Sequence, residues 1–551
     1  MEIAHPLNYK LQSKTYLTLI ILSGIIFFIP FLGRVHLFDW DEINFAESAR
    51  EMIVTGNYHR VQINFQPFWE KPPLFFWLQA LCMKAFGINE FSARLPNAIS
   101  GIITLVTLFY IGRKYKTPLF GFIWAMSFFG TFLPHLYSKS GIIDPVFNYF
   151  IFLGSYFMFK TVTREKGTRN FVYPLLSGLF IGLSTLTKGP VGLLVFGITF
   201  LVYFIFKKFK NFPGIKQILV FAGLYIIVCF FWFGFEVIHN GFWFLKEFIS
   251  YQADLFLHPV ASHGEPFYYH FVVVAVGCFP ISILALPAMF SNKQGKNDFK
   301  LLMKILFWSV MILFSITTTK IVHYSSLTYM PLAFLAAEYL YSLFENNFPV
   351  RKFILVLLVA GAFVFSFLMA AVPYIAMHKD LLIPHLQDPF AVASLNVPVA
   401  WSGYESITGI AYFLLVLIAV VLFTGKEWMK GMLFLFYSTA VCLFIYLITV
   451  VPKIERYSQG PAIDFYKSLQ GKDVYVWPIG FKSYAQYFYT KKPAIPVYGE
   501  ADENFLLKGN ITRPAWFVVK VTNSGFDSTC NKCTLVKQEG GFKFYERLPA
   551  K

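Results

Sequence analysis

The sequence predicts an all-α membrane protein that crosses the bilayer many times and ends in a small α/β domain. Of its 551 residues, 56% are hydrophobic and only 14% are charged, whereas soluble domains carry about a quarter charged residues. Apolar runs close to the ~20 residues that cross a hydrocarbon core recur through residues 1–451. From residue 452 the composition changes to short strand-like runs separated by Gly, Pro, Asn and Asp.

The apolar runs predict thirteen membrane spans. The first, near 16–33, has no small-residue cleavage site behind it and is expected to be an uncleaved signal anchor. The runs on either side of Gly189-Pro190 are also compatible with one kinked helix. The other expected spans lie near 92–112, 117–135, 142–160, 172–187, 189–206, 215–236, 268–288, 301–318, 325–342, 353–376, 407–424 and 430–451.

The distribution of charge predicts the orientation. The net charge of +17 resides in short clusters between apolar runs, which indicates the positive-inside rule and no nucleic-acid partner. Loops after even-numbered spans hold clusters of cations, such as those at 113–116 and 207–210, whereas the short odd-numbered loops hold mostly single cations. The N-terminus is therefore expected in the cytoplasm, with the first loop, 34–91, and the C-terminal domain, 452–551, outside.

The C-terminal domain is predicted from four local patterns. The runs DVYVWPIGF, PAWFVVKV and GFKFYERL predict strands, and GPAIDFYKSLQG predicts a helix. About 100 residues suffice for a small α/β domain beside the transmembrane domain of residues 1–451. Cys530 and Cys533 are expected to form a disulfide, because the external side is oxidising.

The first external loop contains two groups of polar residues suited to chemistry. Asp41 and Glu42 begin the stretch DEINFAESAREMI, which predicts an amphipathic helix lying in the membrane interface. A carboxylate at such a helix start stays ionised and is suited to deprotonate an acceptor hydroxyl in glycosyl transfer. A plain helix cap is the alternative for Asp41.

The second group is the turn from Glu70 to Pro73, whose prolines begin the next helix and hold the charged pair at its mouth. Lys71 is then a point charge suited to a phosphate, and a lysine reaching toward headgroups is the alternative. Further polar residues are expected on the same side, where helix caps and interfacial polarity are the alternatives. They are Asp144, Lys188, His258, His263, Glu265, His270, Lys320, His323 and Tyr324.

Several motifs in one order resemble glycosyltransferase family 39. They are DEINFAESAREM, FWEKPPL, FGINEFSARLP, the aspartate that opens the fourth span, LTKGPVG and SITTTKIVHYSSLTYMP. The resemblance covers residues 16 to about 345. It implies the GT-C fold, shared by lipid A aminoarabinose transferases and protein O-mannosyltransferases. The lipid A enzymes carry Arg and Tyr where this sequence has Asn44 and Phe45.

The resemblance also implies roles for individual residues. Asp41 would be the base, with Glu42 beside it, and Asp144 would be a second acid of the catalytic group. Lys71 would contact the lipid-linked phosphate, and the donor site would include Lys188, Lys320, His323 and Tyr324. A divalent metal ion would bind near Glu70 and His263, with His258 as the alternative ligand. No Gly-rich phosphate loop is present, so no nucleotide cofactor is expected.

The expected activity is inverting transfer of a hexosyl or pentosyl group from a polyprenyl phosphate to a lipid or lipid-linked glycan. It would take place at the external face of a bacterial inner membrane, with membrane lipids as partners. The outer loops are short and aromatic, which favours a lipid acceptor, and the proline-rich loop between spans eleven and twelve is expected to form a lid. A protein O-glycosyltransferase is one alternative. A lipid or oligosaccharide transporter is another, but it would carry polar residues near mid-bilayer.

Overall fold

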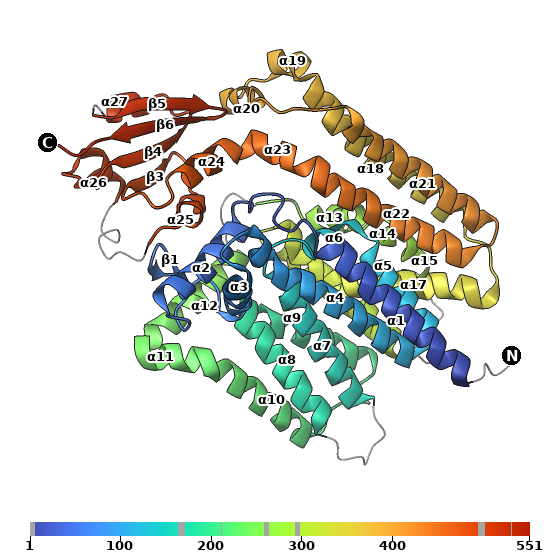
Figure 1. Cartoon of the computed structure of the whole chain (residues 1–551). Coiled ribbons are helices and arrows are strands. Elements are labelled where there is room, and N and C mark those ends of the chain that lie inside the picture. Colours follow the sequence, from blue (N-terminus) through green and yellow to red (C-terminus); the bar gives the residue numbers. More distant parts are fainter. Residues whose placement is uncertain are drawn as a thin grey trace.

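Helices form most of the molecule, and a four-stranded sheet lies at one end (Figure 1). The computed structural model describes residues 6–163, 171–210, 212–257, 264–291, 298–493, 502–530 and 532–550. The first half of the bundle contains α1 (Pro6–Phe28), α4 (Glu90–Tyr115), α5 (Pro118–Phe129), α7 (Asp144–Val162), α8 (Val172–Lys188), α9 (Val191–Phe206) and α10 (Ile215–Cys229). The second half contains α13 (Tyr269–Gly277), α14 (Ile281–Leu284), α15 (Leu286–Met289), α16 (Asp298–Ile316), α17 (Tyr329–Asn346), α18 (Lys352–Met377), α21 (Ile407–Thr424) and α22 (Trp428–Thr449).

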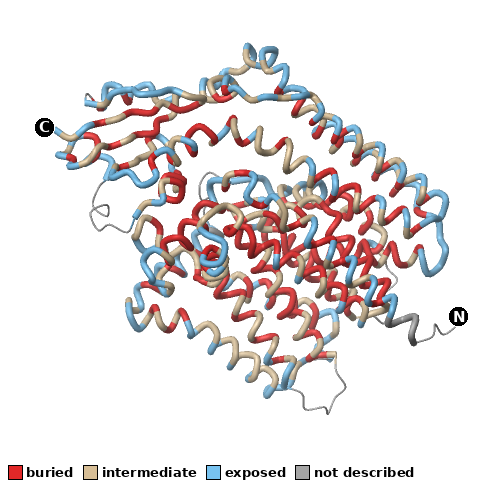
Figure 2. The backbone as a smooth tube through the Cα atoms, viewed as in Figure 1, coloured by how far each residue is buried: buried red, intermediate tan, exposed pale blue. Residues whose placement is uncertain are grey.

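The helices identify a multi-pass membrane protein. Within the described residues, seven are long and apolar enough to cross a bilayer, or eight if the pair bent by 103° at α13–α15 is one span. The outer face of the bundle is apolar: α10 buries none of its residues, and α18 exposes Val356, Phe363 and Phe367 (Figure 2). Lipid is the solvent that suits such a surface. The runs flanking Gly189-Pro190 form two helices that contact each other, so the alternative of a single kinked helix is wrong.

The bundle core holds its helices close together through small and aromatic residues. A Cβ on Gly121 of α5 would lie 2.3 Å from the Phe109 carbonyl oxygen of α4, so only glycine permits this approach. Trp124 stacks edge-on against Phe334 of α17, with ring centroids 5.0 Å apart. Close packing of this kind fixes the helix ends that surround the site described below.

The C-terminal sheet is mixed. It contains β3 (Tyr475–Ile479), β4 (Ala515–Lys520), β5 (Thr534–Glu539) and β6 (Phe542–Arg547) in the order β3-β4-β6-β5. β3 is parallel to β4, and the other two pairings are antiparallel. Three of these strands fall on the strand-like runs of the sequence, whereas β5 was not expected. The helix expected at GPAIDFYKSLQG is α24 (Gly460–Ser468), and α25 (Ala485–Thr490) follows β3.

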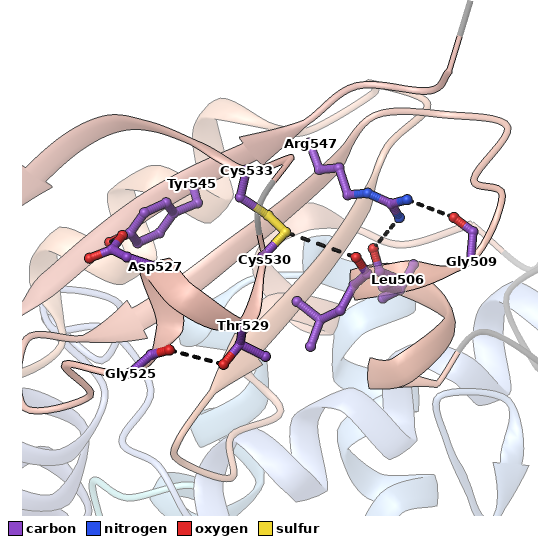
Figure 3. Close-up of a disulfide and its surroundings, with 10 residues drawn as sticks. Leu506, Gly509, Gly525, Asp527, Thr529, Cys530, Cys533, Tyr545 and Arg547 are labelled. Carbon is purple, nitrogen blue, oxygen red and sulfur yellow. Dashed lines mark hydrogen bonds between the residues drawn. A yellow bond between two sulfur atoms is a disulfide. The ribbon is translucent and has the colours of Figure 1, made fainter.

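The predicted disulfide between Cys530 and Cys533 is confirmed. It lies beside α26 (Glu503–Lys508), whose C-terminal end is held to β6 (Figure 3). Arg547 of β6 donates hydrogen bonds to the carbonyl oxygens of Leu506 and Gly509 at 2.6 and 2.7 Å. Carbonyl groups at the end of a helix lack partners within the helix, and the guanidinium supplies them here.

The helix predicted over residues 41–53 is present, but it has no exposed polar side of the kind that an amphipathic helix turns toward solvent. These residues form α2 (Asp41–Thr55), and its run from Glu42 to Met52 is entirely buried. The polar side of the helix is covered by the C-terminal domain, so that Arg50 donates to the Lys492 carbonyl oxygen at 2.8 Å. A single hydrophobic core contains residues of α2, of α3 (Leu74–Phe86), of α24 and α25, and of the sheet.

The proline-rich loop that was expected to form a lid lies beside the C-terminal sheet. The loop between α18 and α21 contains α20 (Pro389–Leu395), which lies beside the sheet in Figure 1. The ring of Phe390 contacts that of Phe542 in β6, with centroids 5.4 Å apart. None of this loop lines the cavity described next, so its prolines shape a contact with the C-terminal domain instead.

Candidate active site

A cavity of about 620 Å³ lies where the first loop meets the ends of the membrane helices. Its floor is formed by the start of α2 and the Glu70-Lys71 turn. Its walls come from the starts of α7 and α9, the end of α16, α12 (Phe242–Leu257) and the 3₁₀ helix η3 (Val322–Thr328). Of the predicted site residues, it brings together Asp41, Glu42, Glu70, Lys71, Asp144, Lys188, His323 and Tyr324.

Asp41 is the first residue of α2, and its carboxylate faces the cavity. The N-cap residue of the helix is Trp40, and no side chain caps the helix by a hydrogen bond, so the plain-cap alternative does not describe Asp41. About a third of the side chain, 31%, is exposed, and its Oδ2 lies 3.6 Å from Nε2 of His323. A carboxylate with this much access can meet a substrate hydroxyl directly.

Asp144 opens α7 immediately before Pro145 and is almost wholly buried. Its Oδ1 accepts a hydrogen bond from Lys188 Nζ at 2.5 Å. Its Oδ2 has no hydrogen-bond partner within the part of the chain that is described, and it lies 3.7 Å from His323 Nε2. The imidazole of His323 therefore stands between two carboxylates, one exposed and one buried.

The electrostatics of the site favour a neutral imidazole. Burial lowers the pKa of His323 below its ordinary value, and the Asp144 carboxylate only partly opposes this effect. Lys188, which pairs with Asp144, lies 4.9 Å above the ring of Tyr324, and that ring contacts the imidazole. The buried aspartate is thus paired with Lys188, and His323 needs no charge to satisfy it.

The Glu70-Lys71 turn is held by α12. Tyr251 donates its hydroxyl proton to Glu70 Oε2 at 2.8 Å, and Lys71 Nζ lies 5.2 Å from the centre of the same tyrosine ring. Burial lowers the pKa of Lys71, and the Glu70 carboxylate raises it in opposition. A lysine held in the wall of a cavity in this way is suited to pair with an anion that enters the cavity.

Glu42 has a different environment from Asp41. Its two oxygens accept from Arg94 Nε and Nη2 at 3.0 and 2.6 Å, and from the backbone N–H groups of Phe38 and Gly141 at 3.0 and 2.5 Å. These bonds hold the pKa of Glu42 below its ordinary value despite its burial. A carboxylate with both oxygens engaged orders the loop, and its predicted part in the chemistry stays a prediction.

Other predicted residues lie outside the cavity. Lys320 is buried, and its Nζ donates to the Thr317 carbonyl oxygen at 2.6 Å instead of lining the cavity. His258 and His263 are not among the described residues. Where the structure is described, no three His, Cys, Asp or Glu side chains form a metal-ligand group. Glu70 alone does not make a metal site, so no step below uses a metal ion.

Several cavity residues were not predicted from the sequence, and two of them hold the Glu70-Lys71 turn. Tyr251 and Gln252 of α12 hold Glu70, with the Gln252 amide 3.4 Å from the Glu70 carbonyl oxygen, although no local motif distinguishes them. Asn44, one of the two departures from the family pattern, lines the cavity. Its Oδ1 is buried without a hydrogen-bond partner among the residues described. A buried polar atom without a partner beside a cavity is suited to contact a ligand.

Comparisons with known proteins agree with the resemblance that the motifs indicate. Residues 70–233 match the family described as dolichyl-phosphate-mannose-protein mannosyltransferase. An uncharacterized protein of Aquifex aeolicus is 28% identical over 64% of this chain and 80% of its own length. An undecaprenyl phosphate-alpha-4-amino-4-deoxy-L-arabinose arabinosyl transferase of Shewanella sediminis is 25% identical over 61% of this chain and 62% of its own length. The match to that transferase therefore spans about three-fifths of its length.

The crystal structure of ArnT from Cupriavidus metallidurans bound to undecaprenyl phosphate superposes over 97% of this chain and 98% of its own. The TM-score is 0.77 at 15% sequence identity, which establishes a common fold. The family match, the transferase relatives and the common fold together support a membrane glycosyltransferase of the GT-C class. These findings support the resemblance to glycosyltransferase family 39 that the motifs indicated.

Proposed function

We propose that this protein transfers a sugar from a polyprenyl phosphate to a lipid or lipid-linked glycan. The observation that carries the proposal is the single cavity in which an accessible carboxylate, Asp41, faces two lysines, Lys71 and Lys188. The similarity to aminoarabinose transferases and to an ArnT structure that binds undecaprenyl phosphate supports the same donor class. The enzyme would cross the bacterial inner membrane thirteen times, with the N-terminus cytoplasmic and the site periplasmic.

The chemistry follows from the arrangement of charges. The Asp41 carboxylate takes the proton of the acceptor hydroxyl while that oxygen attacks the anomeric carbon. The bond from the anomeric carbon to the phosphate oxygen breaks, and polyprenyl phosphate leaves with the electron pair. Lys71 and Lys188 offset the negative charge that grows on the leaving phosphate. Attack opposite to the leaving group inverts the anomeric carbon, and the transferred group is a hexose or a pentose.

Asp144 and His323 would support the base. Asp144 holds Lys188 through the 2.5 Å contact, which would keep the lysine beside the donor phosphate. The neutral imidazole of His323 has one N–H to donate, and Asp41 and Asp144 lie nearly equidistant from its Nε2, at 3.6 and 3.7 Å. The imidazole thereby orients the Asp41 carboxylate without neutralising it.

The remaining wall of the cavity suits a lipid chain. It is apolar and is contributed by α7, α9, α16 and η3. Its side chains are those of Phe147, Ile151, Val191, Val195, Phe314 and Leu327. Apolar walls beside basic groups fit an amphiphile with an anionic head. An extended peptide would instead need hydrogen-bonding groups along its backbone.

Replacing Lys71 with Ala is expected to raise the donor KM about ten- to hundredfold, because a charge-assisted contact with the phosphate is lost. The acceptor KM should change much less. The matched control is Lys84→Ala, which removes a lysine held over the Tyr58 ring at 4.5 Å and outside the cavity. Both constants can be measured in detergent, and an unchanged donor KM would place Lys71 outside the donor site.

The acceptor class is tested with purified enzyme and polyprenyl-phosphate sugars extracted from bacterial membranes. One reaction receives lipid A-type lipids and the other receives peptides rich in serine and threonine, and products are identified by mass spectrometry. Sugar on the lipid is the expected result. Sugar on the peptide alone would identify a protein O-glycosyltransferase. Movement of the donor across vesicles without any transfer would identify a transporter.

A further inference from the structure

We propose that the C-terminal domain positions the catalytic segment, with Tyr489 as the principal positioning residue. The proposal rests on the proposed function in one respect, the role of Asp41 as the base. Asp41 follows a short irregular segment, and the backbone of that segment is bound by side chains from the far end of the chain. We call residues 36–40 the lead-in segment.

Leu37 is the residue of the lead-in segment whose N–H and carbonyl groups are both bound by the C-terminal part of the chain. Its backbone N–H donates to the Tyr489 hydroxyl at 2.8 Å, and its carbonyl oxygen accepts from the Gln459 amide at 2.8 Å. Leu37 is fully buried and Tyr489 is 2% exposed, so water does not replace either bond. The two partners lie 452 and 422 residues away along the chain. Both backbone polar groups of Leu37 therefore depend on the C-terminal part of the protein.

Contacts made by the residues on either side of Leu37 also fix the lead-in segment. His36 Nδ1 lies 3.1 Å from Oε1 of Glu455, which belongs to α23 (Val451–Ser458). Phe38 donates its N–H to Glu42 Oε2 at 3.0 Å, which joins the lead-in segment to the first turn of α2. The segment has no repeating hydrogen-bond pattern of its own, so these side chains define its path.

A second contact fixes the other end of α2. Arg50 donates to Glu47 at 2.6 and 2.7 Å and to the Lys492 carbonyl oxygen at 2.8 Å. Lys492 in turn donates its ammonium proton to Asn64 Oδ1 at 2.6 Å in the turn of the first loop. The C-terminal domain thus holds α2 near both ends, with Asp41 at one of them.

Loss of the Tyr489 hydroxyl should affect the rate more than binding. The two lysines of the cavity come from the Glu70-Lys71 turn and from α8, so the donor phosphate keeps its partners when the lead-in segment shifts. Asp41 lies only four residues from Leu37 and would shift with it. A displacement of about 1 Å in a catalytic group can lower turnover about a hundredfold.

The test compares Tyr489→Phe with Tyr466→Phe. Tyr466 is equally buried in the same core, and within the described residues its hydroxyl has no hydrogen-bond partner. Tyr489→Phe is expected to lower kcat at least about tenfold with the donor KM within about twofold, and Tyr466→Phe is expected to change neither. Hydrogen–deuterium exchange should accelerate at residues 36–45 in Tyr489→Phe only. Wild-type kcat and wild-type exchange in Tyr489→Phe would overturn the proposal.

Two further measurements keep the test decisive. If Tyr489→Phe melts well below the wild type, Gln459→Leu replaces it, and the same criteria apply. This change removes two bonds to the lead-in segment, the one to the Leu37 carbonyl and the 3.5 Å bond from the Asp39 N–H. Exchange is measured without any substrate. Faster exchange at residues 36–45 in a protein that transfers no sugar would support positioning while the proposed function fails. Unchanged exchange in an active enzyme would overturn positioning alone.

Discussion

Asp41→Asn is expected to abolish sugar transfer while leaving the fold and donor binding nearly intact. The carboxamide has the shape of the carboxylate but cannot take the acceptor proton, and loss of a general base lowers rates about 10²–10⁴-fold. The side chain makes no buried ion pair of its own, since its contact with His323 is 3.6 Å and its surface is 31% exposed. Initial rates with excess donor and acceptor measure the loss directly.

The control for this change is Asp254→Asn. Asp254 is exposed on α12, the helix that also carries the cavity residue Tyr251, but it does not line the cavity. It should keep full activity and full binding of polyprenyl phosphate. Turnover near the wild-type level in Asp41→Asn would show that a different group takes the proton.

Breaking the ion pair between Glu42 and Arg94 is expected to lower the free energy of unfolding strongly. Arg94→Met leaves a buried carboxylate without its cation, and removing one partner of a buried pair typically lowers the free energy of unfolding by about 3–5 kcal/mol. Arg94 also donates to the carbonyl oxygens of Leu32, Val35 and His36, at 2.7 to 2.9 Å. Three carbonyl oxygens of the turn that joins α1 to α2 would therefore lose their donor at one position.

The double variant Glu42→Met/Arg94→Met separates the charge effect from packing. Replacing both partners by apolar groups is expected to be less destabilising than Arg94→Met alone, because no unpaired charge remains buried. Thermal unfolding in detergent, with Arg34→Met as the exposed control, measures all three. A single variant as stable as the wild type would show that the loop is held by its other contacts.

The sequence was informative wherever the signal was local. The apolar runs are helical, since a lipid-exposed segment must satisfy its backbone hydrogen bonds internally. The run near 268–288 is an exception in form, because it is broken into α13, α14 and α15. Asp41, Lys71, Asp144 and Lys188 were found because each sits at a helix start or end beside a recognisable motif, and the cavity brings all four together. Such patterns are formed by residues that are close in the sequence, so they can be recognised without knowledge of the tertiary structure.

Tertiary contacts explain what the sequence did not predict. The polar side of α2 looked like a surface for headgroups, yet Arg50 finds its partner at Lys492, which no periodicity reveals. Lys320 belongs to the family motif, but the fold turns it toward Thr317 and out of the cavity. β5 has an almost fully exposed burial pattern, and without alternating apolar residues it gave no strand signal.

The shared core of the first loop and the C-terminal domain has a consequence for the biosynthesis of the protein. Ribosomes add about 5–20 residues per second, so the 452 residues between Leu37 and Tyr489 correspond to about 20–90 s of elongation. During that interval the lead-in segment has emerged without either partner, so these contacts cannot yet hold Asp41 in place. Most of the bundle can insert before the reaction centre exists. A nascent chain stalled before α25 would therefore be a membrane protein whose lead-in segment lacks its Tyr489 partner.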